Sequence, residues 1–262
     1  MGQNIGFYWA NKKDRAELAA AHTKEMATKF SKEISDCISK TQLYDVNFSL
    51  SDIETKDSMS VIIDSMTTTD ALFSYQEGKT AVLNFASFKE PGGGFIAGSR
   101  AQEECLCHDS FLYNVLKTKQ DYYAWNNQNK NLAMYKNRAL YSPNVTFINP
   151  KDDSEVICDV ITCAAPNYSA GFKYGNVSKE ENSKYLDSRI KFVLDIAADQ
   201  KIDTLILGAF GCGVFKQNPQ EVAEIFIKYL KTTHKCFKKV IFAIPADVNS
   251  TNYSAFYETL NS

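Results

Sequence analysis

The residues best suited to chemistry are three consecutive glycines followed, within the same short stretch, by two adjacent carboxylates. Gly92, Gly93 and Gly94 can bring backbone N–H groups close to a ligand because no Cβ stands in the way. A carboxylate held beside such a loop, as Glu103 or Glu104 would be, can act as a general acid or base on the bound group. The stretch therefore predicts a phosphate-sized cradle with a proton donor beside it.

The carboxylates must be positioned by a helix that begins just before them. Ser99 followed three residues later by Gln102 is a capping-box arrangement, which places Glu103 and Glu104 in the first turns of a helix. The helix dipole alone favours acidic residues at that position, so the pair by itself would indicate helix stability rather than catalysis. A second glycine-rich loop elsewhere in the chain moves the interpretation toward function.

That second loop runs from Gly208 to Pro219 and also leads into a helix, with Asn218 as the expected N-cap and Pro219 at the first helical position. Such a turn presents free N–H groups to an anion, and a diphosphate is the natural guest. Phe210 and Phe215 could stack on a base or a ribose nearby. Taken alone, the loop is explained at least as well by tight packing of a strand against a helix.

The strands expected to carry these loops are short and several are continuously apolar, which is typical of strands covered on both faces. They are Asp45–Ser49, Ser60–Asp64, Ala81–Phe85, Val156–Ala164, Thr204–Gly208 and Val240–Pro245. The helices expected between them are Ala101–Lys117, Ser183–Gln200 and Pro219–Lys231. This alternation predicts an α/β fold, a three-layer α/β/α sandwich with a mixed, largely parallel sheet. Both glycine-rich loops then lie beyond carboxyl ends of strands, where such sheets bind ligands.

The N-terminal segment reads as a cover on this core. Apolar residues recur every four positions from Asp14 to Lys40, which predicts one long helix with Asp14 and Glu17 in a capping box. His22 lies on the apolar stripe and is expected to pack rather than to bind a ligand. No linker rich in Pro, Gly or Ser follows, so we expect a single domain over 1–262, with a cover at 1–45 and a core at 46–262.

Composition excludes several function classes. A net charge of −2 and a pI near 6.0 argue against a general nucleic-acid binder. Seven scattered cysteines without a CxxC pair, together with three histidines, give little support for a metal site and indicate a reduced, intracellular protein. The first residues lack the pattern of a secretory signal, and no apolar run is long enough to span a membrane. We therefore expect an intracellular, cytoplasmic protein, or a nuclear one if its source is eukaryotic, without a membrane or an obligate nucleic-acid partner. A monomer is also expected.

A family resemblance joins these motifs. The chain is similar to the microbial-type poly(ADP-ribose) glycohydrolase (PARG) family, whose signature is three glycines, a short spacer and Gln-Glu-Glu. The residues that carry the resemblance are Val82–Ser87, Pro91–Phe95, Ala101–Glu104, Asp109–Tyr113, Ile161–Asn167 and Leu207–Phe215. Nearly the whole chain is covered. The chain departs from the family at His108, where an arginine or similar residue is usual, and at Cys105 and Cys107, which replace small residues.

The resemblance implies a macrodomain-like core with an N-terminal helical extension that binds ADP-ribose and hydrolyses the ribose–ribose O-glycosidic bond of poly(ADP-ribose). Glu104 would be the catalytic acid/base, and Glu103 would orient the ribose hydroxyls. The implied substrate-binding residues are Asn84, Ser87, Gly92, Gly93, Gly94, Phe95, Gln102, Gly211, Cys212, Gly213, Val214 and Phe215. No cofactor is implied, and the partners are poly(ADP-ribose) or ADP-ribosylated macromolecules, with ADP-ribose as product.

Two other functions remain open at this point. One is a hydrolase that removes single ADP-ribose units from protein or nucleic acid, and the other is a non-catalytic ADP-ribose reader. The intact Glu103–Glu104 pair argues against a reader, which needs no acid. Cys212 is expected to fill a tight turn rather than to act as a nucleophile. His108 shares a helical face with Glu104 and could tune it, but a surface position is the favoured expectation.

Overall fold

The computed structural model describes residues 10–50, 52–56, 58–246 and 251–262 and contains a seven-stranded sheet. Its strands are β1 (Gln42–Tyr44), β2 (Ser60–Asp64), β3 (Thr80–Phe85), β4 (Ala139–Ile148), β5 (Glu155–Cys163), β6 (Thr204–Leu207) and β7 (Lys239–Ala243). Their order in space is β1-β4-β5-β3-β6-β7-β2. The pairs β1–β4 and β4–β5 are antiparallel and the other four are parallel, which confirms the mixed, largely parallel sheet.

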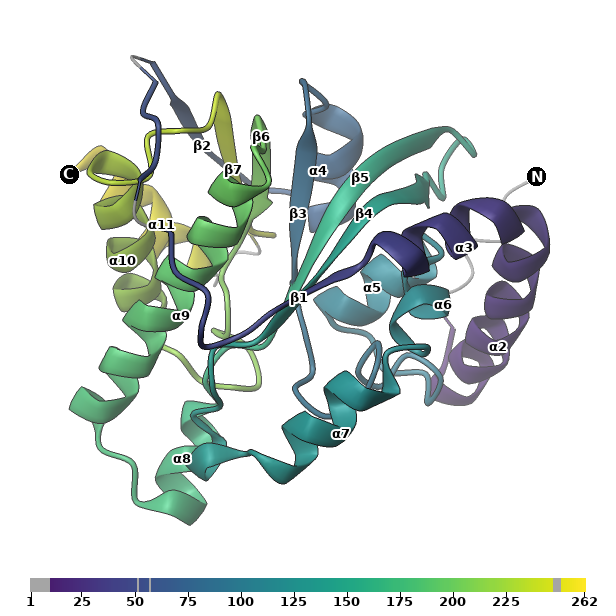
Figure 1. Ribbon diagram of the computed structural model, residues 1–262, viewed down its shortest axis with the longest axis horizontal. Helices are drawn as coiled ribbons and strands as arrows, with labels where there is room; N and C mark the ends of the chain where they lie inside the picture. The colour runs from purple at the N-terminus through teal and green to yellow at the C-terminus, as the bar shows by residue number, and fades with distance from the viewer. Residues whose placement is uncertain (1–9, 51, 57, 247–250) are drawn as a thin grey trace.

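Helices cover both faces of the sheet (Figure 1). One layer holds α2 (Lys12–Lys29), α3 (Ser31–Lys40), α4 (Thr68–Ser74), α5 (Gln102–His108), α6 (Leu112–Leu116) and α7 (Gln120–Gln128). The opposite layer holds α9 (Lys179–Asp199), α10 (Pro219–Lys231) and α11 (Thr251–Asn261). A short 3-10 helix η1 (Asn131–Ala133) and α8 (Tyr168–Gly175) pack together at one end of the molecule.

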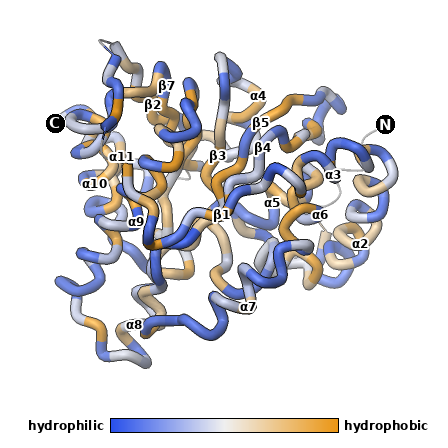
Figure 2. The backbone as a smooth tube through the Cα atoms, in the orientation of Figure 1, coloured by the Kyte–Doolittle hydropathy of each residue, from blue (hydrophilic) through white to orange (hydrophobic). Residues whose placement is uncertain are grey.

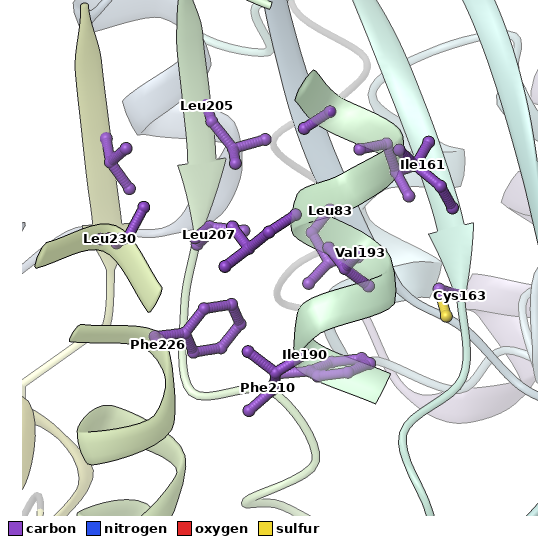
Figure 3. Packing of buried hydrophobic residues seen from close by; sticks show 14 of the residues in the cluster. Leu83, Ile161, Cys163, Ile190, Val193, Leu205, Leu207, Phe210, Phe226 and Leu230 are labelled. Carbon is purple, nitrogen blue, oxygen red and sulfur yellow. The ribbon is translucent and has the colours of Figure 1, made fainter. Parts of the chain in front are cut away.

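The core lies on both sides of the central strands. Between the sheet and α9, buried side chains such as Leu83, Ile190 and Val193 interlock (Figure 3). On the other face Val82 and Ile206 pack with residues of α5 and α6. The apolar colouring follows the strands along the middle of the molecule (Figure 2). Burial on both faces is why these strands are continuously apolar, and removing that surface from water holds the three layers together.

The topology places the two glycine-rich loops side by side. β3 pairs with β6 in parallel, so the loops that follow Phe85 and Leu207 leave the sheet at the same edge. The N-terminus of α10 is as expected, since the Asn218 side chain accepts hydrogen bonds from the backbone N–H groups of Gln220 and Glu221. The expected position of the ligand site beyond the strand ends therefore depends on one strand pairing, which brings together segments about 120 residues apart.

The expected long helix from Asp14 to Lys40 is wrong in one respect, because it is interrupted at Phe30. That residue leaves helical geometry, with φ −120° and ψ 34°, and its ring is buried against Phe111, so α2 and α3 pack as separate segments. The N-cap is Asn11, whose side chain accepts from the N–H groups of Lys13 and Asp14. The expected capping box of Asp14 with Glu17 is therefore also wrong.

The expected helix Ala101–Lys117 is likewise two helices, α5 and α6. Between them Ser110 forms a bridge to Phe147 of β4, and the Ile148 N–H donates to the Asp109 carbonyl at 2.7 Å. The helix therefore ends here, because the backbone of Asp109 and Ser110 pairs with the end of β4 instead. The helical periodicity of the local residues does not reveal this break, because the partner that causes it lies far away in the sequence.

Two strand expectations also fail. Residues Asp45–Ser49 form a turn in which the Asn47 N–H donates to the Asp45 side chain, and the strand is β1, just before it. β4, the longest strand, was not expected at all. It contains Pro143 and shifts register between Ser142 and Val145, and proline inside a run argues against a strand unless it lies at such a bulge.

Other boundaries are close to expectation, although α9 begins at Lys179, after the Ser178 N-cap, rather than at Ser183. α4, α7, α8 and α11 are additional helices. Residues 1–9, on which the expectation of no secretory signal depends, lie outside the described part of the chain. Across the residues that the structure describes, none of the helices combines the length and apolar character needed to cross a bilayer.

Candidate active site

A pocket of about 610 Å³ opens at the edge of the sheet where β3 and β6 end. One wall is the glycine-rich loop after β3 with the first turn of α5, and the facing wall is the loop after β6. The two loops come together because their strands are neighbours in the sheet. The volume is that of a typical small-molecule site, and the lining combines apolar side chains with a few polar groups, as such sites do.

Glu104 lies in the first turn of α5 and ties that helix to the glycine loop. Its Oε1 accepts a hydrogen bond from the Gly94 N–H at 2.8 Å, and its Oε2 accepts from the Ala101 N–H at 2.7 Å. Glu104 therefore caps its own helix, so the expected capping pair of Ser99 and Gln102 is wrong. The side chain is 6% exposed and lines the pocket, which leaves a small face of the carboxyl group open to a ligand.

Glu103 is held from the other side, by residues after β3. Its Oε2 accepts from the Ser87 N–H at 2.6 Å and its Oε1 accepts from the Asn84 amide at 3.2 Å. Burial, with a smaller contribution from the nearby Glu104 charge, raises the pKa of the Glu103 carboxyl to about 8 against the lowering effect of its hydrogen bonds. Glu103 therefore keeps a proton at neutral pH, inside a pocket wall.

Gly93 fits between the two carboxyl groups. A Cβ at this position would lie 2.6 Å from the Glu104 Oε1 and 2.8 Å from the Glu103 Oε2, and the residue has φ +60°. Both the contact distances and the left-handed backbone exclude a larger residue. At Gly94 a Cβ would collide with the Ser99 side chain. The glycines therefore let the loop close onto both acids, which a phosphate cradle alone would not require.

Gln102 joins α5 to the end of β3. Its side-chain oxygen accepts from the Phe85 N–H at 2.8 Å, and its amide donates to the Leu83 carbonyl at 2.8 Å. The amide thus pairs with the strand as a neighbouring strand would, and it fixes the start of the helix that carries both acids. Gln102 also lines the pocket, but its hydrogen bonds identify it as a positioning residue.

The facing wall is the loop from Gly208 to Gln217. Gly211 has φ +77°, and a Cβ there would lie 2.8 Å from the Ala165 Cβ, so the loop folds tightly here. Gly213 has open space around it, and Val214 is 81% exposed at the rim, so this part of the loop is free to contact a ligand. Phe210 is buried beneath the loop, with its ring packed on Phe85.

The structure brings most of the expected site residues to the pocket. Those that line it are Ser87, Gly93, Gly94, Gln102, Glu103, Glu104, Gly211, Gly213, Val214 and Phe215. Asn84, Gly92, Phe95 and Cys212 are not among the lining residues and lie behind it. Asn84 is fully buried and reaches only Glu103 and Thr162, so it supports the acid from behind. Phe95 is fully buried in the core, with its ring against Tyr113.

Cys212 is a packing residue in this structure. It packs against the core cluster beneath the sheet, and burial raises the pKa of its thiol to about 12. A thiol that stays protonated is a poor nucleophile, which agrees with the expectation that Cys212 fills a turn.

Part of the pocket wall was not found from the sequence. Thr67, Thr68 and Thr69 at the start of α4 line it, as does the segment from Ala243 to Pro245 after β7. Thr67 is the N-cap of α4 and accepts from the Asp70 N–H, so the pattern Thr-x-x-Asp was a usable signal for this helix. Asn252 of α11 completes the wall, and no local pattern marks a residue so far along the chain.

His108 is buried, at 2% exposure, so the favoured expectation of a surface position is wrong. Its ring stacks on that of His22 in α2, with centroids 5.2 Å apart, and lies 3.4 Å from Asp109. The His22 Nε2 donates to the Ser110 carbonyl at 2.9 Å, because a carbonyl oxygen can only accept. Burial lowers the pKa of His22. The two rings therefore join the N-terminal helix to the helix that carries the acids.

A metal centre finds no support in the geometry. Within residues 10–50, 52–56, 58–246 and 251–262, no three His, Cys, Asp or Glu side chains are grouped as a metal ion would require. The polar residues that line the pocket are the two glutamates together with threonine, serine, glutamine and asparagine side chains, a set suited to a ligand rich in hydroxyl groups.

Comparison with known proteins decides the family. The model of the microbial-type PARG catalytic domain matches residues 12–150, a segment that holds the glycine loop, Gln102 and both acids. The chain belongs to this family. The curated proteins include none with a significant match to the chain.

Solved structures extend the likeness across the fold. The poly(ADP-ribose) glycohydrolase of Thermomonospora curvata superposes with a TM-score of 0.83 at 25% identity, covering 95% of this chain and all of that one. The same bacterium's enzyme bound to the inhibitor ADP-HPD gives 0.81 at 27% identity, covering 94% of this chain and 99% of that one. The Deinococcus radiodurans enzyme in complex with ADP-ribose gives 0.79 at 29% identity, covering 88% of this chain and 98% of that one. The macrodomain-like fold of bacterial PARG structures is therefore shared over nearly the whole chain.

Proposed function

We propose that this protein is a poly(ADP-ribose) glycohydrolase that cleaves ribose–ribose O-glycosidic bonds and releases ADP-ribose. The observation that carries the proposal is the pair of buried carboxyl groups closed against Gly93, facing a second glycine-rich loop across one pocket. Membership of the microbial-type PARG family and the ADP-ribose complex of a homologue support it. The whole chain, with residues 12–40 as a cover, would act as one catalytic domain.

In this mechanism the ligand's diphosphate lies along the loop from Gly211 to Phe215, where backbone N–H groups favour an anion. That contact holds the terminal ribose against the opposite wall, so the anomeric carbon is fixed next to Glu104. Cleavage passes through an oxocarbenium-like state, and the departing ribose oxygen needs a proton. Glu104 donates that proton and then takes one from the attacking water.

Glu103 has the separate task of holding the ribose. Its carboxyl group is anchored by Ser87 and Asn84 and keeps a proton near neutral pH, so it can donate a hydrogen bond to a ribose hydroxyl oxygen. A neutral Glu103 also adds no negative charge beside the ligand's diphosphate, which is itself negatively charged. The two adjacent acids thus differ in environment and in role, a division that suits acid–base chemistry.

The test is to incubate the protein with protein-free poly(ADP-ribose) and, separately, with a mono-ADP-ribosylated protein, and to measure free ADP-ribose. We expect release from the polymer. Glu104→Gln should abolish most of it and leave ADP-ribose binding within about tenfold, because an amide keeps the shape but cannot transfer the proton. Release only from the mono-modified protein would instead identify a mono-ADP-ribosyl hydrolase, and release from neither, with binding intact, a reader. Turnover near wild type in Glu104→Gln would overturn the role of Glu104.

A further inference from the structure

A second, smaller cavity lies next to the candidate active site, and we name it the α8 pocket. Its volume is about 380 Å³, and the residues of its wall used below are Lys89, Lys130, Leu132, Tyr135 and Tyr174. It forms where η1 and α8 pack together, at the end of the molecule where α8 is labelled in Figure 1. Nothing in the mechanism above uses these residues.

The α8 pocket shares a wall with the active-site pocket. Phe215 lines the larger pocket, and its ring lies 6.4 Å from the ring of Tyr135, which lines the smaller one. On the other side the chain passes from Ser87, whose N–H holds Glu103, to Lys89 two residues later. The two pockets are therefore joined by a ring contact and by one short chain segment.

The charge of the α8 pocket is positive. Two lysines and no acidic residue are among the residues that line it. Within the described part of the chain, neither the Lys89 nor the Lys130 ammonium group lies within ion-pair distance of a carboxylate. Lys173 is a further cation next to a lining residue, with its ammonium 5.0 Å from the ring centroid of Tyr174.

A buried arginine strengthens this field from behind. Arg189 of α9 is fully buried, and its guanidinium contacts the Ala164 carbonyl and the Asn137 side chain rather than a carboxylate. Its Nη2 has no hydrogen-bond partner within the described residues. Ala164 and Tyr135 belong to one small buried cluster, so this uncompensated charge lies close behind the pocket wall. Such a charge is costly to bury, and a bound anion nearby would offset that cost.

The backbone of the segment that shapes the pocket is strained, because several of its residues have left-handed dihedral angles. Asn131, Leu132, Ala133 and Tyr135 all have positive φ, between 44° and 67°, and none is glycine. Residues in this region are rare and are held only where the surrounding structure demands it, most often at binding sites. Leu132 at 60% exposure, the buried Tyr135 and Tyr174 at 76% exposure all line the pocket.

From this juxtaposition we infer that the α8 pocket is a second subsite. It binds the phosphates and the adenine of the next ADP-ribose unit of the polymer, which is joined to the terminal unit by the bond that is cut. The inference rests on the proposed function, because it assigns a place to the next unit of the same polymer. Lysines supply the charge for a diphosphate, and an exposed tyrosine supplies a face on which a base can stack. A single ADP-ribose molecule in the main pocket would leave the α8 pocket untouched.

The experiment compares the wild type, the double variant Lys89→Ala/Lys130→Ala, Tyr174→Ala and the matched control Lys231→Ala, whose lysine is exposed on α10. Each hydrolyses protein-free poly(ADP-ribose) at several salt concentrations, and ADP-ribose binding is measured by calorimetry. We expect the double variant to raise KM for the polymer about tenfold, with kcat and ADP-ribose affinity within twofold, and to lower the salt slope by about 0.7 for each lysine lost. Tyr174→Ala should raise KM several-fold without changing the salt slope.

Three results would overturn the inference. An unchanged KM in the double variant, with an active wild type, would leave the proposed function intact and remove the subsite. An effect seen only when the polymer is attached to a protein would assign the pocket to the acceptor protein instead. A wild type that does not hydrolyse the polymer would remove both the proposed function and this subsite.

Discussion

At the scale of single residues, two neighbouring glutamates occupy different environments although they are adjacent in the sequence. Glu104 accepts from two backbone N–H groups, one from its own helix and one from the glycine loop. Glu103 is anchored by Ser87 and Asn84, and burial raises its pKa to about 8. A helix turns about 100° per residue, so consecutive side chains meet different neighbours. The different environments of the two acids follow from that rotation, and the division of labour that we propose rests on them.

This environment predicts an alkaline limb in the pH profile of the reaction. The folded Glu103 carboxyl keeps its proton up to a pKa of about 8, so the protonated fraction, and with it kcat/KM, should fall as the pH rises through that value. In Glu103→Gln the group is neutral at every pH, so the variant should be slower but should lose this limb. Measuring kcat/KM from pH 6 to 10 checks it, and an unchanged alkaline limb in the variant would show that another group titrates there.

At the scale of elements, the site depends on a loop and a helix that lock onto each other. The loop after β3 donates to Glu104 through Gly94 and leaves room at Gly93 for both carboxyl groups. Gln102 pairs with the backbone of β3 and so fixes where α5 begins. Neither element holds the acids in place alone, because the acids themselves provide the contacts between the two.

Gly93→Ala tests this mutual fit. The added Cβ would lie under 3.0 Å from an oxygen of each acid, in a left-handed backbone that costs an alanine about 1–2 kcal/mol. We expect the free energy of unfolding to fall by at least that amount and the hydrolysis rate to fall by more than tenfold, about 1.4 kcal/mol or more in the barrier, because the carboxyl groups must move.

Gly213→Ala is the matched control for stability, because a Cβ there would meet nothing within 4 Å. Chemical denaturation should show a change within about 0.5 kcal/mol for this variant. Equal losses of stability in the two variants would contradict the argument from close contact, since they would reflect glycine content rather than position.

At the scale of the whole molecule, the N-terminal helices are joined to the helix that carries the two acids through a buried histidine pair. His22 of α2 stacks on His108 of α5 and donates to the carbonyl of Ser110, at the break between α5 and α6. Burial lowers the pKa of His22, while the neighbouring charges of Asp109 and Glu25 raise it by smaller amounts. The N-terminal cover therefore depends on a neutral imidazole at the centre of its contact.

This contact predicts that stability decreases in mild acid. The unfolded chain takes up a proton on His22 near its ordinary pKa of about 6.5, whereas the folded chain resists it, so stability falls as the pH drops below that value, by up to about 1.4 kcal/mol per pH unit from this residue. His22→Gln keeps a donor for Ser110 but does not titrate. Urea unfolding at pH 7.5 and at pH 5 should show a smaller loss for the variant. An equal loss in both proteins would assign the acid sensitivity elsewhere.

The sequence by itself determined the fold class, the position of the two glycine-rich loops at strand ends, the family and the acid pair. Apolar runs, turn residues and short motifs are local signals, and they can be read from the sequence without the tertiary structure. The sequence did not reveal β4, because Pro143 hides a strand whose pairing depends on a bulge. Breaks at Phe30 and after His108 were also missed, because distant partners cause them.

Only the tertiary structure decided which residues line the pocket. It moved Asn84, Gly92, Phe95 and Cys212 behind the pocket wall and added the threonines of α4. It buried His108, and it raised the pKa of Glu103 by withdrawing that carboxyl group from water. Burial, side-chain direction and contact across the sheet depend on how layers pack, and packing joins residues whose separation along the chain carries no signal of their meeting.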